Sequence, residues 1–186
     1  MKPNLAILMF AITLTPQLLL SQEISVISDG FTGKELIKDL KKNGFTISNY
    51  TLPIINSCDF NQEAGNLYKL VIIKGNEIPL DTNKAAYQNI EKIRKFAESK
   101  GYTSPPIEVA PLLRKKISNE EMKKMGFNNL IIMHDPIKDT DGFRVLFIID
   151  CDGYILHCFC YKTTPFSMAQ REGVGFVFLD SSTYLK

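Results

Sequence analysis

The chain has 186 residues, with 22 basic and 20 acidic side chains, four cysteines and 45% hydrophobic residues. This length fits one domain with a sizeable core. Because the charges nearly cancel, the composition points neither to nucleic acid nor to an anionic membrane surface as a partner.

The first 21 residues have the features of a signal peptide. Lys2 precedes an apolar run, Leu5–Leu20, and Ser21 is a small residue in a position suited to cleavage, although the A-x-A pattern is missing. The run is interrupted by polar residues and is shorter than the about 20 apolar residues of a spanning helix. We expect residues 22–186 to form one domain that is secreted or periplasmic and has no stable membrane span. An uncleaved N-terminal anchor is the alternative.

Four elements are expected before the longest helix. Thr32 and Glu35 form a capping box, which predicts the start of a helix that Asn43-Gly44 ends. Pro53 is expected to stop the strand that precedes it. The four elements are a strand at Ile24–Ile27, a helix at Gly33–Lys42, a strand at Phe45–Leu52 and a strand at Leu67–Ile73.

The strongest helical pattern in the chain lies at Asn83–Ser99. Its apolar residues recur at helical spacing and predict one buried face. The residues of that face are Ala86, Ile90, Ile93 and Ala97, with Phe96 beside them. The residues expected to face water are Lys92, Arg94, Lys95 and Glu98.

The segment after this helix is rich in proline. Pro111 interrupts Ile107–Arg114, which we expect to form two short turns or a kinked helix. Ser118 and Glu121 form a second capping box, which predicts a short helix before Gly126. The remaining elements are a strand at Asn129–Met133, a polar loop at His134–Gly142 and a last strand at Val174–Leu179.

The most apolar stretch of the domain, Arg144–Tyr161, predicts a β-hairpin. The Asp-Gly pair at 152–153 suits a two-residue type I′ turn, because both residues tolerate positive φ. With this turn, Phe147 faces Cys158. Both faces of the hairpin are apolar, so we expect it to lie centrally in a sheet that is covered on both sides.

Export makes disulfide bonds possible, and the number of cysteines is even. Cys158 and Cys160 are two residues apart on one strand and are poorly placed to bond each other. We expect one bridge from Cys58 to the hairpin, with Cys151, Cys158 or Cys160 as its partner. Such a bridge closes a loop of roughly 100 residues and contributes up to about 4–5 kcal/mol in the chain-entropy model. A zinc site at these cysteines has little support, because zinc sites usually show C-x-x-C spacing.

The loop His134–Gly142, HDPIKDTDG, holds the leading candidates for a polar site. His134 and Asp135 follow an apolar strand, and a histidine beside a carboxylate can act as a general base. The catalytic candidates are His134, Asp135 and Glu108. The competing interpretation is a solvated connector whose Asp side chains bond their own backbone in Asx turns.

The binding candidates are Arg114, His134, Asp135, Asp139 and Asp141. Asp139, Asp141 and Gly142 resemble part of a calcium loop, but Ile137 and Ile148 occupy positions at which an EF-hand needs oxygen ligands. An irregular calcium site on the three Asp residues of the loop is the alternative. We predict no metal site and no cofactor.

Glu108 and Arg114 lie among apolar residues in the proline-rich segment. If Pro111 bends this segment, one of them can pair with the His134–Gly142 loop. The alternative is an ordinary surface charge and a helix-end cation.

The sequence identifies no ligand or substrate. We expect an α+β fold with a mostly antiparallel sheet of five or six strands, on which one long and two or three short helices pack.

The first functional hypothesis is a non-catalytic binding module for an unknown protein or small molecule, with its site near His134–Gly142. One alternative is a small hydrolase that uses His134 and a neighbouring carboxylate. Another is an inhibitor or structural protein that acts through a sheet edge, with Val174–Leu179 as the candidate strand. Asn49 lies in a glycosylation sequon, which matters only in a eukaryotic host.

Overall fold

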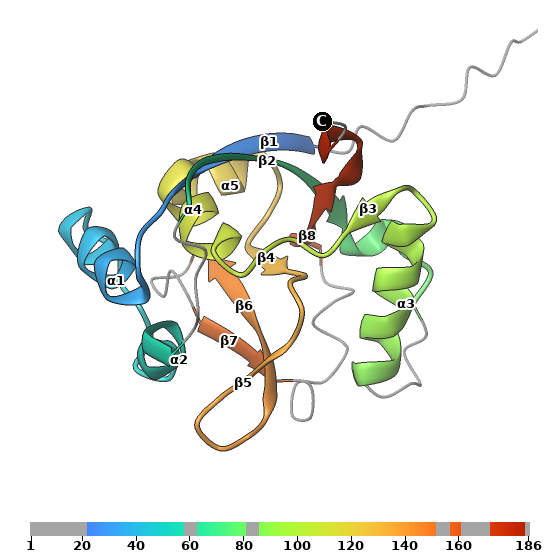
Figure 1. Ribbon diagram of the computed structural model, residues 1–186. Coiled ribbons are helices and arrows are strands. Elements are labelled where there is room, and N and C mark those ends of the chain that lie inside the picture. Colours follow the sequence, from blue (N-terminus) through green and yellow to red (C-terminus); the bar gives the residue numbers. More distant parts are fainter. Residues whose placement is uncertain (1–21, 58–62, 81–85, 152–156, 161–171, 185–186) are drawn as a thin grey trace, which may run out of the picture.

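The computed structural model describes residues 22–57, 63–80, 86–151, 157–160 and 172–184 (Figure 1). Its elements in chain order are β1 (Gln22–Asp29), α1 (Gly33–Lys42), α2 (Thr51–Ser57), β2 (Ala64–Lys74), η1 (Gly75–Glu77), α3 (Ala86–Glu98), β3 (Tyr102–Thr103), α4 (Val109–Lys116), α5 (Asn119–Lys124), β4 (Asn129–Ile132), β5 (Ile137–Lys138), β6 (Arg144–Asp150), β7 (His157–Cys160), β8 (Val174–Asp180) and η3 (Ser181–Tyr184). None of the helices in these ranges has the length and hydropathy that crossing a bilayer requires.

A mostly antiparallel sheet confirms the predicted α+β class. Its central path is β1-β2-β8-β4-β6, and β7 also pairs with β6. β3 pairs with β8, and β5 pairs with β6 beyond the end of β4. Among the described residues, all pairs are antiparallel except β4–β8. Six of these strands have four residues or more, which agrees with the expected five or six.

The β6–β7 pair has the predicted hairpin register. Phe147 pairs with Cys158, and the ladder runs from Val145–Cys160 to Ile148–His157. The Asp-Gly turn itself lies outside the described residues. Side chains on both faces of β6 are buried, at 5% exposure or less from Val145 to Ile149. The hairpin strand is therefore covered on both sides, as the sequence predicts.

Two hydrophobic cores form on the two faces of the sheet. Four helices cover one face, and each contributes a fully buried side chain: Leu40 from α1, Ile55 from α2, Leu113 from α4 and Met122 from α5. α3 covers the other face with Ile90, Ile93 and Ala97. Figure 1 accordingly places α3 on the opposite side of the molecule from α1 and α2.

β8 lies in the middle of the sheet, so the expectation that Val174–Leu179 forms an exposed edge is wrong. The strand pairs with β2 on one side and with β4 on the other, and Val174–Leu179 is buried throughout. An uninterrupted apolar strand is typical of a position covered on both faces. At Gly175, a Cβ atom would lie 2.7–2.8 Å from side-chain atoms of Ile72, Leu130 and Phe127. The absence of a side chain at Gly175 thus allows three elements to pack closely.

Two prolines lie inside helices, where the sequence predicts breaks. The expected strand at Phe45–Leu52 is wrong, because α2 begins at Thr51, whose backbone N–H donates to Ser48. Pro53 and Pro111 are each the third residue of their helix, α2 and α4. The first four N–H groups of a helix have no intrahelical acceptor, so proline loses no hydrogen bond there. The part of the proline-rich segment from Val109 to Arg114 consequently belongs to one helix, α4, and the expected interruption at Pro111 is wrong.

The capping boxes place two helices as predicted. In α1 the Glu35 N–H donates to Thr32 Oγ1, and Glu35 Oε2 accepts from the Thr32 N–H. The Ser118–Glu121 pair makes the same two bonds at the start of α5. These boxes fix where α1 and α5 begin without help from the tertiary structure.

Candidate functional site

His134 lies at an interruption between β4 and β5, which pair with the same strand, β6. Ile131 pairs with Ile148, but the next pair along the ladder is Ile137 with Val145. Six residue steps therefore stand opposite three, which makes a bulge. The Phe147 N–H donates to His134 Nε2 at 3.0 Å, so the imidazole provides an acceptor within the interrupted ladder.

Both ring nitrogens of His134 bond to backbone. Because Nε2 accepts, Nδ1 carries the proton and donates to the Asp135 carbonyl at 2.7 Å. Burial lowers the pKa of His134 to about 4; the bond to Asp135 opposes this shift, and the charge on Arg94 adds to it. A neutral imidazole that is 1% exposed and has both nitrogens engaged is suited to holding the bulge rather than to moving protons.

Arg94 of α3 holds the other side of the bulge. Its guanidinium donates to the Met133 carbonyl at 3.0 Å and to the His134 carbonyl at 2.6 Å. The expectation that Arg94 faces water is therefore wrong, and its side chain is only 12% exposed. The cause lies in the tertiary structure, because carbonyls freed by the bulge need a donor. The Asp135 carboxylate is 93% exposed and lies 3.8 Å from Arg94, a surface pair that contributes little.

The rest of the loop forms a local turn. Asp139 Oδ1 accepts from the N–H groups of Asp141 and Phe143, at 3.0 and 2.7 Å. Gly142 has a φ of 81°, which a glycine adopts without strain. The described residues contain no group of three side chains that could hold a metal ion. The arrangement is the Asx turn of the connector interpretation.

Glu108 and Arg114 are both buried, so the interpretation of Glu108 as a surface charge is wrong. Arg114 lies in the last turn of α4, as expected for a helix-end cation, but its side chain is in the interior. Glu108 is 5% exposed and accepts a hydrogen bond from the Tyr68 hydroxyl at 2.8 Å. Arg114 is 1% exposed and donates to Asn119 Oδ1 at 2.8 Å. Among the described residues, no hydrogen bond, ion pair or ring contact joins either residue to His134, whose partners are Phe147 and Asp135.

Cys151 is the one cysteine whose side chain the structure describes. It is buried, and its Sγ lies 3.6 Å from the carbonyl oxygens of Asn119 and Phe127. Cys58 and the side chains of Cys158 and Cys160 lie outside the described residues. The disulfide from Cys58 to the hairpin therefore stays a prediction.

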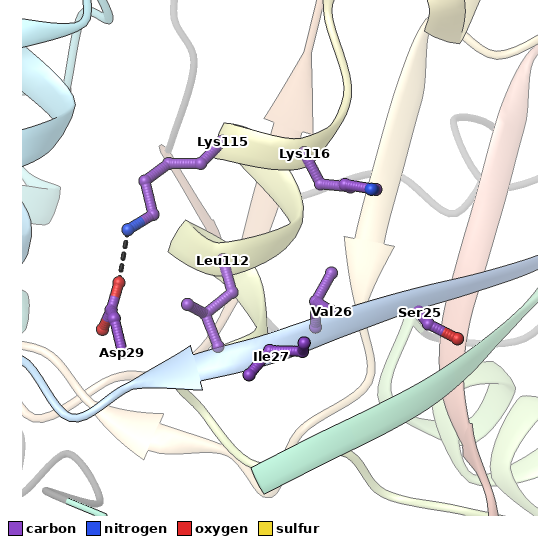
Figure 2. Close-up of a pocket in the computed structure, with 7 residues that line it drawn as sticks. All are labelled: Ser25, Val26, Ile27, Asp29, Leu112, Lys115 and Lys116. Carbon is purple, nitrogen blue, oxygen red and sulfur yellow. Dashed lines mark hydrogen bonds and ion pairs between the residues drawn. The ribbon is translucent and has the colours of Figure 1, made fainter. Parts of the chain in front are cut away.

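A pocket of about 380 Å³ lies between α4 and β1 (Figure 2). It is lined by Ser25, Val26, Ile27, Asp29, Leu112, Lys115 and Lys116. Side chains alternate between the two faces along a strand. Because consecutive residues of β1 line the pocket, it runs along the backbone edge of that strand. In the described part of the chain β1 pairs with β2 alone, so this edge is available.

The two lysines at this groove differ in their partners. The Lys115 ammonium bonds Asp29 at the end of β1 and Asp39 of α1, as Figure 2 shows for Asp29. Burial lowers the pKa of Lys115, but the bonds to these two carboxylates outweigh burial and leave the pKa raised. Lys116 is exposed and makes no ion pair with any described residue. Lys116 is therefore the cation that remains available at the groove.

This groove is not among the sites predicted from the sequence. One signal was present in the sequence. Ile27 lies on the same face of β1 as Glu23 and Ser25, and it is an apolar residue on a face that is otherwise polar. In the structure Ile27 is 61% exposed and pairs with Leu67, which is 50% exposed. These two side chains add an exposed apolar surface beside the strand edge.

Comparison with family models, curated proteins and solved structures found no significant match to the chain.

Proposed function

We propose that the protein is a non-catalytic binding module that takes up an extended peptide segment as an additional strand beside β1. The observation that carries this proposal is the groove between α4 and the backbone edge of β1 that no other described strand pairs with. In β-strand addition, main-chain hydrogen bonds to a sheet edge supply affinity, and neighbouring pockets select side chains. The groove offers both components.

The groove also limits the chemistry of its ligand. Leu112 and Val26 give it an apolar floor, while Lys116 is the cation at its rim without an ion-pair partner in the described chain. Lys115 is already neutralised by two carboxylates. The occupant that fits is a segment of a partner protein in which an apolar residue stands next to an acidic one.

The site of action that we propose is outside the cytoplasm, secreted or periplasmic. This part of the proposal rests on the signal-like residues 1–21 and on nothing in the fold. A small hydrolase based on His134 has less support, because the two ring nitrogens bond backbone groups of Phe147 and Asp135.

Selection of short random peptides displayed on phage tests the binding mode. A selected peptide is then made with an N-methyl group at each position in turn. Successive N–H groups of a strand point to opposite sides, so methylation should weaken binding at every second residue only. Binding should also shift the backbone amide NMR signals of Ser25–Ile27. Uniform loss along the peptide, or shifts confined to other strands, would contradict strand addition.

A charge reversal tests the chemistry of the rim. Lys116→Glu should weaken a selected acidic peptide by about three- to tenfold, because it replaces an attractive exposed charge with a repulsive one. Lys123→Glu makes the same change at an exposed position of α5 that does not line the groove. Equal affinities of the two variants would remove Lys116 from the site.

A further inference from the structure

A second pocket, of about 350 Å³, lies next to Arg114. One wall is formed by the residues that follow α1, and the other by the start of α5. The lining residues are Asn43, Gly44 and Phe45 after α1, and Ser118, Asn119 and Glu120 at α5. Lys115 and Lys116 of α4 line the β1 groove, whereas Arg114 lines this pocket. The two pockets thus share a helix but no lining residue.

Arg114 has more hydrogen-bond donors than partners. A guanidinium has five N–H groups. One bonds Asn119 Oδ1 at 2.8 Å and one lies 3.4 Å from Met122 Sδ, a weak acceptor. Nε is fully buried and has no partner among the described residues. Three of the five N–H groups therefore lack an acceptor in the described part of the chain.

The charge of Arg114 is also poorly compensated. No carboxylate among the described residues lies within ion-pair distance of its guanidinium. The ring of Phe45 lies 5.2 Å away and offers a cation–π contact. Burial lowers the pKa of Arg114, and the nearby Cys151 and Asp150 offset this only in part. A buried cation without an anion is unfavourable, and an oxyanion in the pocket would supply the missing negative charge.

The rim of the pocket restricts which anion fits. Glu120 is exposed and lines the same pocket, so a second negative charge on the ligand would be repelled. From the buried guanidinium and this single acidic residue, we propose that the pocket binds a small monocarboxylate ligand through Arg114. This site is separate from the peptide groove and does not depend on the proposed function.

Titration with sodium acetate, against sodium chloride at equal ionic strength, tests the proposal. The Nε–H signal of Arg114 in the NMR spectrum should shift saturably, together with the amides of Gly44, Phe45 and Asn119. Inorganic phosphate should produce a smaller response, because of Glu120. A linear response that chloride reproduces would overturn the site, as would shifts that leave Arg114 unaffected.

Two variants separate binding from folding. Arg114→Met should abolish the acetate response, while Lys124→Met, an exposed change of the same type on α5, should retain it. If Arg114→Met fails to fold, Glu120→Gln decides, because it leaves Arg114 intact and should increase the response to phosphate at least twofold. An unchanged phosphate response in Glu120→Gln would show that this rim does not select the anion and would overturn the monocarboxylate assignment. Glu120→Gln should not affect peptide binding at β1. A negative result for the monocarboxylate pocket therefore does not contradict the proposed peptide groove.

Discussion

At the scale of the residue, burial decides what the charged and polar side chains do. Glu108, Arg114 and His134 are each exposed by 5% or less, although their residue types are usually found at the surface or partly exposed. Each is held by a different kind of partner. Glu108 accepts from a tyrosine, His134 bridges two backbone groups, and Arg114 donates to an amide. Only Arg114 keeps a buried nitrogen without a partner in the described chain.

The free energy of unfolding should fall as the pH is lowered through the titration of His134. Its pKa is about 4 in the folded protein, against an ordinary value of 6.5. The unfolded chain therefore takes up the proton first. The stability due to neutral His134 is fully present above pH 6.5 and is lost as the pH falls toward 4. From these two pKa values, the free energy of unfolding at pH 5 is lower than at neutral pH by about 2 kcal/mol.

Urea unfolding between pH 5 and 8 measures this loss. His134→Gln keeps an acceptor for the Phe147 N–H but does not titrate, so its stability should vary less with pH. The comparison is made in a His157→Gln background, with and without His134→Gln. The chain has only two histidines, so His134 is the only histidine left to titrate in the first protein and none is left in the second. Parallel pH dependence in the two proteins would mean that His134 is not the titrating group.

At the scale of the element, α4 shows how eight residues serve three environments. Leu113 enters the core, Arg114 lines one pocket, and Lys115 and Lys116 line the other. Adjacent helical positions are about 100° apart, so a short helix between a sheet and two neighbouring helices presents each of them a different residue. The position of α5 matters for the same reason, because Asn119 is its first residue and holds Arg114.

Loss of the α5 capping box should have a double effect. Ser118→Ala removes the acceptor for the Glu121 N–H and should lower the free energy of unfolding by about 1 kcal/mol. Thr32→Ala should have a similar effect through α1. Only Ser118→Ala should also shift the NMR signal of Arg114 Nε–H, because α5 carries Asn119, which accepts a hydrogen bond from the Arg114 guanidinium.

Thr46→Ala is the matched control for these variants, since Thr46 is exposed and lies outside any helix. Urea unfolding gives the stabilities. An unchanged stability in both cap variants would mean that the two helices do not depend on their boxes.

At the scale of the whole molecule, β8 organises the sheet. It is the only described strand that pairs with β2, β3 and β4, and it joins the N-terminal β1–β2 pair to the β4–β6 region. Its one parallel pairing lies between residues about 45 positions apart, such as Leu130 and Gly175. The sheet that separates the two cores is therefore completed by a strand that comes late in the chain.

Gly175→Ala tests this packing. Its added methyl would lie under 3 Å from Ile72, Leu130 and Phe127, so the free energy of unfolding should fall by about 1–3 kcal/mol. Thr103→Ala, an exposed change in β3, should have a much smaller effect. Chemical denaturation of both variants gives the comparison, and a neutral Gly175→Ala would show that β2, β4 and β8 can move apart at little cost.

Local chemistry in the sequence was enough to predict much of the fold. The capping boxes at Thr32 and Ser118 place α1 and α5, and the Asp-Gly spacing predicts the register in which Phe147 meets Cys158. These features depend on residues close together in the chain, so their free energies are decided locally. The predictions at the two in-helix prolines were wrong because proline is accepted in the first turn of a helix as readily as it ends one.

The candidate site was less predictable, because it depends on which distant segments meet. The sequence alone determined the α+β class, the positions of most strands and helices, and the apolar character of both faces of β6. Only the tertiary structure decided that β8 is central and β1 is at the edge, that His134 supports a bulge, and that Arg114 is buried beside a pocket. The physical reason is that burial and edge exposure are properties of long-range pairing, which local propensity and periodicity do not encode.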